Sequence, residues 1–331
     1  MAKEKPTLYL VRTVNLPDLE RIAKEELEDI AAIRTEQEKT GRDLGRILSD
    51  ATAIIVDSNT NVTADVIDEM RTCKIIVTAT VGFNHIDLNA AGRKGIYVSN
   101  SPGYCTEEVA DHTICLLLAL ARKIFVFNDI TRSGKWDDWS LAEPVYRLRG
   151  RTLGIIGLGR IGTAVALRAK VFGLDVIAFD PYIPIGHDTA LGIKSVNFDT
   201  LLRDSDAISI HVPLTDETLR MISNREFERM KTGVLIINTS RGAVIDHDAL
   251  VNGLKSQKVA GAGIDVFENE PPTADDPLLK MGNVVTTPHT GFLSVESQRD
   301  RQSMAIDEVR RILENERPRS VVNLTMMTEP I

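Results

Sequence analysis

Residues 152–180 constrain the fold of this chain more than any other segment. An apolar run at 152–156 leads into the glycine pattern Gly157-Leu-Gly159-Arg-Ile-Gly162, which opens a helical pattern reaching about Phe172. Glycines so spaced make a tight turn, let the backbone approach a pyrophosphate and permit close helix–strand packing. The start of the helix adds free N–H groups that favour phosphates. A second apolar run then ends at Asp180, so the segment predicts a strand–turn–helix–strand unit that binds a dinucleotide.

The charge at the end of the second run predicts which dinucleotide is bound. Asp180 stands 180 − 157 = 23 residues after Gly157, which suits a hydrogen bond to the adenosine ribose diol. Its carboxylate would repel the 2′-phosphate of NADP, and Pro181-Tyr182 supplies no arginine to offset that repulsion. The sequence therefore predicts NAD as the cofactor.

Composition excludes several classes of partner. Lys and Arg number 39 against 47 Asp and Glu, a net charge of −8, and no basic run stands out, which argues against nucleic acid and anionic membranes as partners. Cys73, Cys105 and Cys115 form no CxxC pair, so three free thiols in a reducing compartment are expected. The first residues have no apolar core, and the longest apolar stretch, 113–121, is too short to span a bilayer. We therefore expect a cytoplasmic protein.

Short apolar runs alternate with amphipathic segments on both sides of the glycine turn. Such alternation predicts parallel sheets covered by helices on both faces. Before the turn we expect strands at 7–11, 53–56, 74–78 and 96–98, helices at 18–27, 44–50, 64–71 and 86–95, one long helix at 106–132 and a loop at 135–151. After residue 180 we expect strands at 207–212, 234–238, 261–266 and 283–287, and a final helix at 294–315.

The central position of the glycine turn predicts an inserted nucleotide domain. Too few residues follow about 292 to make a domain, so the C-terminal segment is expected to fold back onto the first one. The predicted domains are an NAD-binding Rossmann domain at 101–291 and a discontinuous substrate-binding (catalytic) domain at 1–100 and 292–331. Two crossings of the chain between domains would provide a cleft and a hinge.

Three polar residues follow later strands, where α/β sheets place their ligands: Arg241, Glu270 and His289. Singly they could be a surface arginine, a loop carboxylate and a capping histidine. Together they supply what reduction of a 2-oxo acid needs. Arg241 can hold a carboxylate with two hydrogen bonds and polarise the neighbouring carbonyl. His289 can protonate the carbonyl oxygen as hydride arrives, and Glu270 would orient the imidazole and raise its pKa.

Three segments carry a family resemblance: 153–162, 230–242 and 263–271. With them the chain resembles the D-isomer-specific 2-hydroxyacid dehydrogenases over essentially its whole length. Segments 148–154 and 164–170 look closest to the C-terminal-binding-protein branch and its bacterial relatives. The fold class expected is α/β, with two Rossmann-like domains built on parallel sheets. The discontinuous substrate domain is expected to be flavodoxin-like, and the inserted NAD-binding domain is expected to have the Rossmann fold.

The resemblance also implies roles for particular residues. Arg241, Glu270 and His289 would be the catalytic set, and Asp265 would hydrogen-bond the nicotinamide amide. The other residues expected to bind the cofactor are Gly157, Gly159, Arg160, Ile161, Gly162, Asp180, Val212, Pro213, Thr218, Thr239, Ser240, Gly291 and Thr106. Those expected to bind the substrate are Val81 and Gly82 through their backbone N–H groups, Arg241, Asn59 and Phe292. A homodimer formed through 106–139 is also implied.

Several local features leave alternatives open. Family members that use phosphoglycerate typically have an arginine in the loop matching 57–60; here Asp57 would repel a phosphate, and no C-terminal regulatory domain is expected. His85 is either a turn or capping residue or has a role in substrate entry. Phe292 either favours a small or apolar substrate tail or packs in the core. Trp136 and Trp139 either pack against a partner subunit or cap the substrate pocket.

The sequence therefore predicts an NAD-dependent D-2-hydroxyacid dehydrogenase that interconverts a small 2-oxo acid, such as glyoxylate or hydroxypyruvate, and its D-hydroxy acid. No metal is expected, because His112, His187, His211 and His247 show no ligand spacing and are interpreted as structural or solvated. One alternative is an NAD(H)-sensing dimeric scaffold like the corepressors. Another is an NAD-dependent dehydrogenase of a different acid, such as phosphite or phosphoglycerate.

Overall fold

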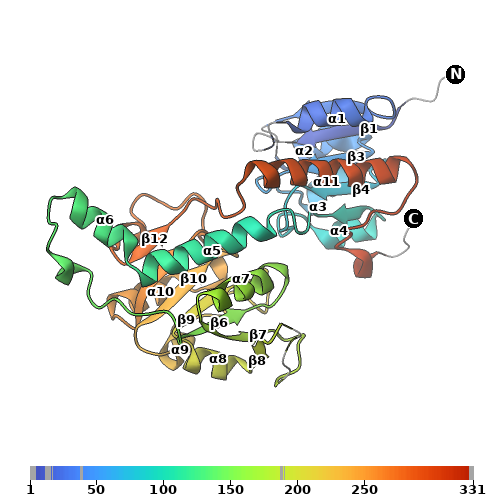
Figure 1. The fold of residues 1–331 in the computed structure, drawn as a ribbon. Coiled ribbons are helices and arrows are strands. Elements are labelled where there is room, and N and C mark those ends of the chain that lie inside the picture. Colours follow the sequence, from blue (N-terminus) through green and yellow to red (C-terminus); the bar gives the residue numbers. More distant parts are fainter. Residues whose placement is uncertain are drawn as a thin grey trace. The chain divides into compact units, whose positions relative to one another are not determined.

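The computed structural model describes residues 5–11, 16, 18–37, 40–186, 189 and 191–327, without the side chain of Leu141. The chain forms two compact units, one of Met1–Tyr104 with Ser294–Ile331 and one of Cys105–Leu293. Figure 1 shows the first unit in blue and red and the second in green to orange. The functional assignment of the two predicted domains, and their predicted bounds, stay predictions.

A parallel sheet of five strands organises the first unit, in the order β2-β1-β3-β4-β5. This order is that of flavodoxin-like folds, in agreement with the predicted class. The strands are β1 (Thr7–Val11), β2 (Ala32–Glu36), β3 (Ala53–Val56), β4 (Ile75–Thr78) and β5 (Tyr97–Ser99). The helices are α1 (Leu19–Leu27), α2 (Gly41–Ile47), α3 (Ala64–Glu69), α4 (Leu88–Arg93) and α11 (Val295–Leu313).

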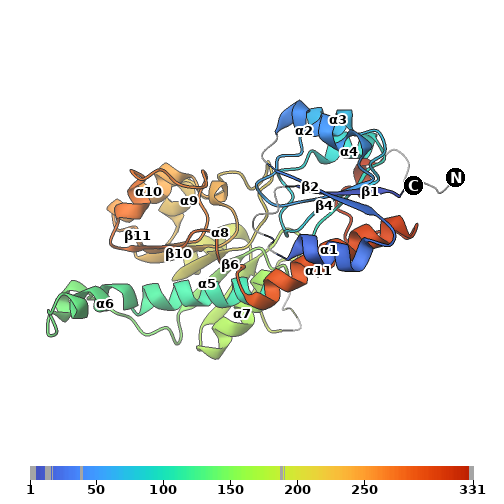
Figure 2. The same ribbon diagram turned by 90° about the horizontal axis from the view of Figure 1, so that it is seen from above.

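Successive side chains of each strand point to opposite faces of this sheet, and both faces are buried. Leu8 and Leu10 of β1 belong to a core that also contains residues of α1 and α11. Tyr9 and Val11 belong to the opposite core, with residues of α2, α3 and α4. Figure 2 shows α1 and α11 on one side of the sheet and the other three helices across it. The C-terminal helix is therefore part of the first unit's core, because it completes one of the two covering layers.

The second unit contains a parallel sheet of seven strands, in the order β12-β11-β10-β9-β6-β7-β8. Counted from β6 as the first strand, the order is 7-6-5-4-1-2-3, the Rossmann order with one added edge strand. The strands are β6 (Thr152–Ile156), β7 (Asp175–Phe179), β8 (Lys194–Ser195), β9 (Ala207–Ile210), β10 (Val234–Asn238), β11 (Val259–Ile264) and β12 (Val284–Thr286). The two parallel α/β sheets confirm the predicted fold class.

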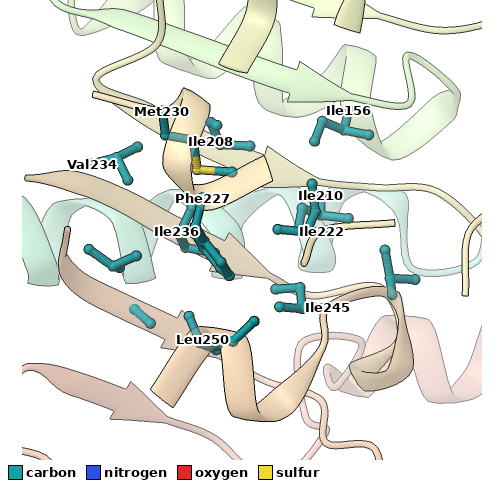
Figure 3. Close-up of a cluster of buried hydrophobic side chains, with 14 of the residues drawn as sticks. Ile156, Ile208, Ile210, Ile222, Phe227, Met230, Val234, Ile236, Ile245 and Leu250 are labelled. Carbon is teal, nitrogen blue, oxygen red and sulfur yellow. The ribbon is translucent and has the colours of Figure 1, made fainter. Parts of the chain in front are cut away.

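Helices cover both faces of this second sheet as well. They are α5 (Thr106–Ala121), α6 (Ile124–Arg132), α7 (Arg160–Val171), α8 (Phe198–Asp204), α9 (Asn224–Arg229) and α10 (His247–Lys255). Residues of α5 and α7 share one core with the sheet, and residues of α8, α9 and α10 share the other. In Figure 3, isoleucines of the sheet such as Ile208 and Ile236 meet Phe227 and Met230 in this second core.

Two sequence expectations differ from the structure. The single helix expected at 106–132 is wrong, because Lys123 takes a left-handed conformation with φ 51° and separates α5 from α6. A left-handed residue commonly ends a helix, and glycine is the usual residue there, so this lysine gives little warning of the break. The edge strands β2 and β8 were not expected, because their sequences, AIRTE and KS, contain no apolar run.

Within the described residues, no helix has the length and apolar character needed to cross a membrane.

Candidate active site

The glycine turn lies between β6 and α7, and two of its glycines are required by packing. Gly157 has φ 89°, and a Cβ atom there would lie 2.9 Å from the carbonyl oxygen of His211. A Cβ atom on Gly162 would lie 2.1 Å from the carbonyl oxygen of Gly157. Gly159, the N-cap of α7, meets no atom within 4 Å of its would-be Cβ. The middle glycine therefore leaves open space at a helix start, which fits the pyrophosphate of a dinucleotide.

Asp180 follows β7, and the turn orients its carboxylate. Its Oδ2 accepts a hydrogen bond from the N–H of Leu158 at 2.9 Å, and its Oδ1 accepts one from the N–H of Tyr182 at 3.0 Å. The acid is thereby fixed beside the glycine turn while keeping lone pairs for a ribose diol. Pro181 and Tyr182 add no positive charge, and Tyr182 is exposed. This part of the site fits NAD.

His289 and Glu270 form a close pair. Nδ1 of His289 lies 2.7 Å from Oε2 of Glu270, and both side chains are a little more than one-third exposed. Burial raises the pKa of Glu270, but His289, the N–H of Phe267 and the charge of Arg241 outweigh it and lower that pKa below its ordinary value. An ionised carboxylate only accepts hydrogen bonds, so Nδ1 carries the proton directed at Glu270. Nε2 is thereby left for a reacting group.

Arg241 follows β10 and begins a 3-10 turn at Gly242–Val244. One guanidinium nitrogen donates to the carbonyl oxygen of Ser240 at 2.6 Å. The turn is braced by buried Asn238, whose amide donates to the carbonyl of Arg241 at 2.9 Å and whose Oδ1 accepts from Ser240. Arg241 is close enough to Glu270 for its charge to lower the carboxyl pKa. The structure therefore brings Arg241, Glu270 and His289 together.

Asp265 holds the backbone of the segment that contains His289. His289 has a left-handed φ of 53°, and its N–H donates to the carbonyl oxygen of Asp265 at 2.8 Å. The Asp265 carboxylate accepts from the N–H groups of Thr290 and Gly291, each at 2.9 Å, and from the hydroxyl of Thr287. Asp265 is only 2% exposed. The contacts show a residue that fixes this segment; its predicted bond to the nicotinamide stays a prediction.

His112 of α5 also contacts this segment, which the sequence did not indicate. Its Nε2 lies 2.9 Å from the Thr287 hydroxyl and 3.6 Å from Oδ1 of Asp265.

The other described histidines outside the pair with Glu270 contact other parts of the chain. His211 is bonded through Nε2 to the Ser209 hydroxyl at 2.8 Å, and burial lowers its pKa to about 3. His247 faces Asp276 at 3.6 Å. His187 lies outside the described residues, and among those described no three ligating side chains could hold a metal ion.

The remaining predicted cofactor residues follow other strands of the same sheet or begin helices that pack on it. After β9 come Val212, Pro213 and Thr218, whose hydroxyl donates to the Pro213 carbonyl at 2.6 Å. The Thr239 hydroxyl, after β10, lies 2.9 Å from that of Thr113. Thr106 begins α5, and Arg160, followed by Ile161, begins α7. Since all strands are parallel, the residues that follow β6, β7, β9, β10, β11 and β12 share one edge of the sheet.

Phe292 lies beside His289. Its ring centroid is 6.4 Å from that of His289, in an edge-on arrangement with a 79° interplanar angle. Its side chain therefore contributes to the apolar surroundings of the imidazole. Whether it limits the substrate tail stays a prediction.

The predicted substrate loop belongs to the first unit and follows β4. Val81 and Gly82 stand there, and Val81 is 37% exposed. Within the described part of the chain, their N–H groups donate to no acceptor. Two such N–H groups in succession suit an anionic oxygen. His85 is bonded through Nε2 to the Thr78 hydroxyl at 3.2 Å, which ties this loop to the strand that precedes it.

The loop 57–60 is held together by its own aspartate. Asp57 is 3% exposed, and its Oδ1 accepts from the N–H of Asn59 at 2.9 Å and from the Thr60 hydroxyl at 3.2 Å. The carboxylate thus helps to form the turn, and its repulsion of a phosphate stays a prediction. Contact of Asn59 with a substrate stays a prediction.

The fold and the site define a nicotinamide-dependent dehydrogenase. They combine a glycine turn, an acid after the second strand and a histidine–carboxylate pair at the same edge of the sheet. Residues 114–291 match the family model described as D-isomer specific 2-hydroxyacid dehydrogenase, NAD binding domain. The chain belongs to the D-isomer-specific 2-hydroxyacid dehydrogenase family. The match confirms the predicted family, its class of NAD-dependent oxidoreductases and NAD as cofactor. Membership of the C-terminal-binding-protein branch stays a prediction.

Individual relatives agree with this family. A glyoxylate reductase from Korarchaeum cryptofilum is 37% identical over 321 residues, 96% of each chain. A D-3-phosphoglycerate dehydrogenase from Archaeoglobus fulgidus is 43% identical over 272 residues, 82% of this chain but 51% of the relative, so this chain spans about half of that protein. The crystal structure of a glyoxylate reductase from Paecilomyes thermophila has a TM-score of 0.87 at 29% identity and covers 97% of this chain and 99% of that one.

Proposed function

We propose that this protein is an NAD-dependent D-2-hydroxyacid dehydrogenase that reduces a small 2-oxo acid such as glyoxylate or hydroxypyruvate. The observation that carries the proposal is the 2.7 Å contact between Nδ1 of His289 and Glu270, with Arg241 close by. A proton donor, its carboxylate partner and a guanidinium are what this reduction requires. The glyoxylate reductase relative, which matches over nearly its full length, supports the choice of substrate class.

The chain's residues divide the reaction between them. Arg241 binds the substrate carboxylate and polarises the carbonyl. Bound NADH supplies a hydride to the carbonyl carbon. Nε2 of His289 gives its proton to the carbonyl oxygen, so the product is a hydroxy acid, and takes it back in the reverse direction. Glu270 stays ionised and stabilises the positive imidazole before the proton leaves.

Cofactor and substrate binding rest on separate groups. The N–H groups at the start of α7 and the open space at Gly159 receive the pyrophosphate, and Asp180 receives the ribose diol. Asp265 binds the nicotinamide amide in addition to holding the segment of His289. The N–H groups of Val81 and Gly82 bind the substrate carboxylate.

A second copy of the chain is the proposed protein partner. In the segment 135–151 that follows α6, Trp136 and Trp139 are 72% and 62% exposed, and Ile124 of α6 is 59% exposed. Large apolar groups so exposed favour an interface. Analytical ultracentrifugation should show a dimer that dissociates in the W136A/W139A double variant. A double variant that stays dimeric but has a raised KM would instead favour the pocket-capping role.

The function is tested by following NADH oxidation with glyoxylate, hydroxypyruvate, pyruvate and 3-phosphohydroxypyruvate, and NAD reduction with D-glycerate and phosphite. We expect turnover with a small 2-oxo acid. Preference for 3-phosphohydroxypyruvate or phosphite would replace the proposed substrate. Tight NADH binding without turnover of any of these compounds would contradict the dehydrogenase and favour a scaffold.

A further inference from the structure

The three peptide groups around Val81 and Gly82 are each fixed at the carbonyl side. The carbonyl oxygen of Thr80 accepts from the N–H of Ser101 at 2.9 Å, and that of Val81 accepts from the amide nitrogen of Asn100 at 2.7 Å. The carbonyl oxygen of Gly82 accepts from the Thr80 hydroxyl at 2.6 Å. A carbonyl and the following N–H belong to one planar group and point in opposite directions. The carbonyls of Thr80 and Val81 therefore fix the N–H groups of Val81 and Gly82, and the carbonyl of Gly82, which fixes the N–H of Phe83, closes the turn around them.

The hydroxyl that holds Gly82 is itself held by a chain of hydrogen bonds. Thr80 Oγ1 lies 2.8 Å from Thr78 Oγ1, which lies 3.2 Å from Nε2 of His85. The direction of this chain follows from its end, because the Gly82 carbonyl can only accept. The Thr80 hydroxyl donates its one hydrogen to the Gly82 carbonyl, so the Thr78 hydroxyl donates to Thr80 Oγ1. Nε2 of His85 must then donate to Thr78 Oγ1. His85 can make this donation both as the neutral Nε2–H tautomer and as the cation.

We propose that Thr80, supported by Thr78 and His85, is a positioning residue that sets the affinity of this loop for the substrate carboxylate. The inference rests on the proposed binding of that carboxylate by the N–H groups of Val81 and Gly82. Thr80 touches no substrate: its hydroxyl holds the Gly82–Phe83 peptide group, which closes the turn that contains the N–H groups of Val81 and Gly82. Loss of the hydroxyl lets that peptide rotate, and the cost of reordering it appears in binding.

Two substitutions of Thr80 separate the effect of its shape from that of its hydroxyl donor. In Thr80→Val the shape is kept and the donor is lost, whereas in Thr80→Ser the donor is kept. Thr78→Val breaks the same chain one step earlier and carries the test if Thr80→Val fails to fold. Thr72→Val is the matched control, because the Thr72 hydroxyl donates to the carbonyl of Ala51 at 3.0 Å, outside the loop.

The test is calorimetric binding of oxamate, an unreactive analogue of a 2-oxo acid, to the NADH-loaded protein, together with KM and kcat for glyoxylate. Loss of one partly buried hydrogen bond predicts a Kd for oxamate, and a KM, about tenfold higher in Thr80→Val. We expect unchanged kcat and NADH affinity, a smaller effect in Thr78→Val, and affinities near wild type for Thr80→Ser and Thr72→Val.

Each outcome bears on the inference. Equal oxamate affinity in wild type and Thr80→Val overturns the positioning role while leaving the proposed function intact, as does an equal loss in Thr72→Val. Wild-type protein that binds no oxamate also overturns it. Failure of the proposed function is recognised separately, by the absence of turnover with every 2-oxo acid in the wild type.

Discussion

The backbone of Gly242 lies against that of Phe267, so closely that a Cβ atom on Gly242 would stand 2.0 Å from the Phe267 carbonyl carbon. Gly242 directly follows Arg241, and Phe267 donates its N–H to Glu270 at 3.0 Å. The contact therefore sets the spacing between the turn that contains Arg241 and the turn that contains Glu270. Only a residue without a side chain allows that spacing.

Gly242→Ala tests this contact. The added methyl cannot fit against backbone atoms, so the two turns must separate, at a cost of about 1–3 kcal/mol in the free energy of unfolding. Because Arg241 then moves relative to Glu270, kcat/KM is expected to fall by about 10²-fold. Gly282→Ala is the control, since its Cβ would meet no atom within 4 Å. Equal activity of the two variants would show that the spacing is not needed.

Glu270→Gln tests the partner of His289. The amide keeps the shape but removes the negative charge that stabilises a positive imidazole, so kcat with a 2-oxo acid should fall about 10²-fold or more. Glu268→Gln is the control, because that carboxylate pairs with Arg220 at 3.0 Å. Steady-state kinetics near pH 7 compare the two. A Glu270→Gln variant as fast as Glu268→Gln would remove the basis for the assigned role.

Asp180→Ala tests the choice of cofactor. The change removes the acceptor for the ribose diol and the charge that repels a 2′-phosphate, so the ratio of kcat/KM for NADPH to that for NADH should rise about tenfold or more. Asp175→Ala, an exposed acid at the start of β7, should leave the ratio unchanged. An unchanged ratio in Asp180→Ala would mean that another residue excludes the phosphate.

Stability should depend on pH through His211. Its pKa in the folded protein is about 3, against an ordinary value of 6.5, so between these values the unfolded chain binds one proton more. The free energy of unfolding therefore falls as the pH drops below about 6.5, by up to about 1.4 kcal/mol per pH unit. Chemical unfolding of wild type and His211→Gln at pH 7.5 and pH 5 measures this. If both lose the same stability, His211 is not the source.

The strand-end residues could be predicted because one pattern fixes many positions. Once the glycine turn identifies a parallel sheet, the residues after each strand must lie at its carboxyl-end edge, and this places Asp180, Arg241 and His289 along that edge. The 23-residue spacing and the apolar runs needed no tertiary information. The same reasoning could not find β2 or β8, which are outermost strands of their sheets and have no apolar run.

Contacts between distant segments could not be predicted from the sequence. Gly242 is one glycine among 22 until its neighbour is known. His112 lies 175 residues from Thr287, and its place beside the segment of His289 depends on how α5 packs on the sheet. The charge of Asp57 alone predicts repulsion of a phosphate, but gives no sign of the hydrogen bonds that its carboxylate accepts from Asn59 and Thr60.

Turnover of a 2-oxo acid by wild type and His289→Asn tests most directly whether His289 is the proton donor. Asparagine tolerates the left-handed backbone found at His289, so the variant removes the imidazole with little change in the segment. We expect a kcat lowered by about 10²–10⁴-fold, with the Kd for NADH within about twofold of wild type. A variant that keeps most of the wild-type rate would contradict the assignment of His289 as the proton donor.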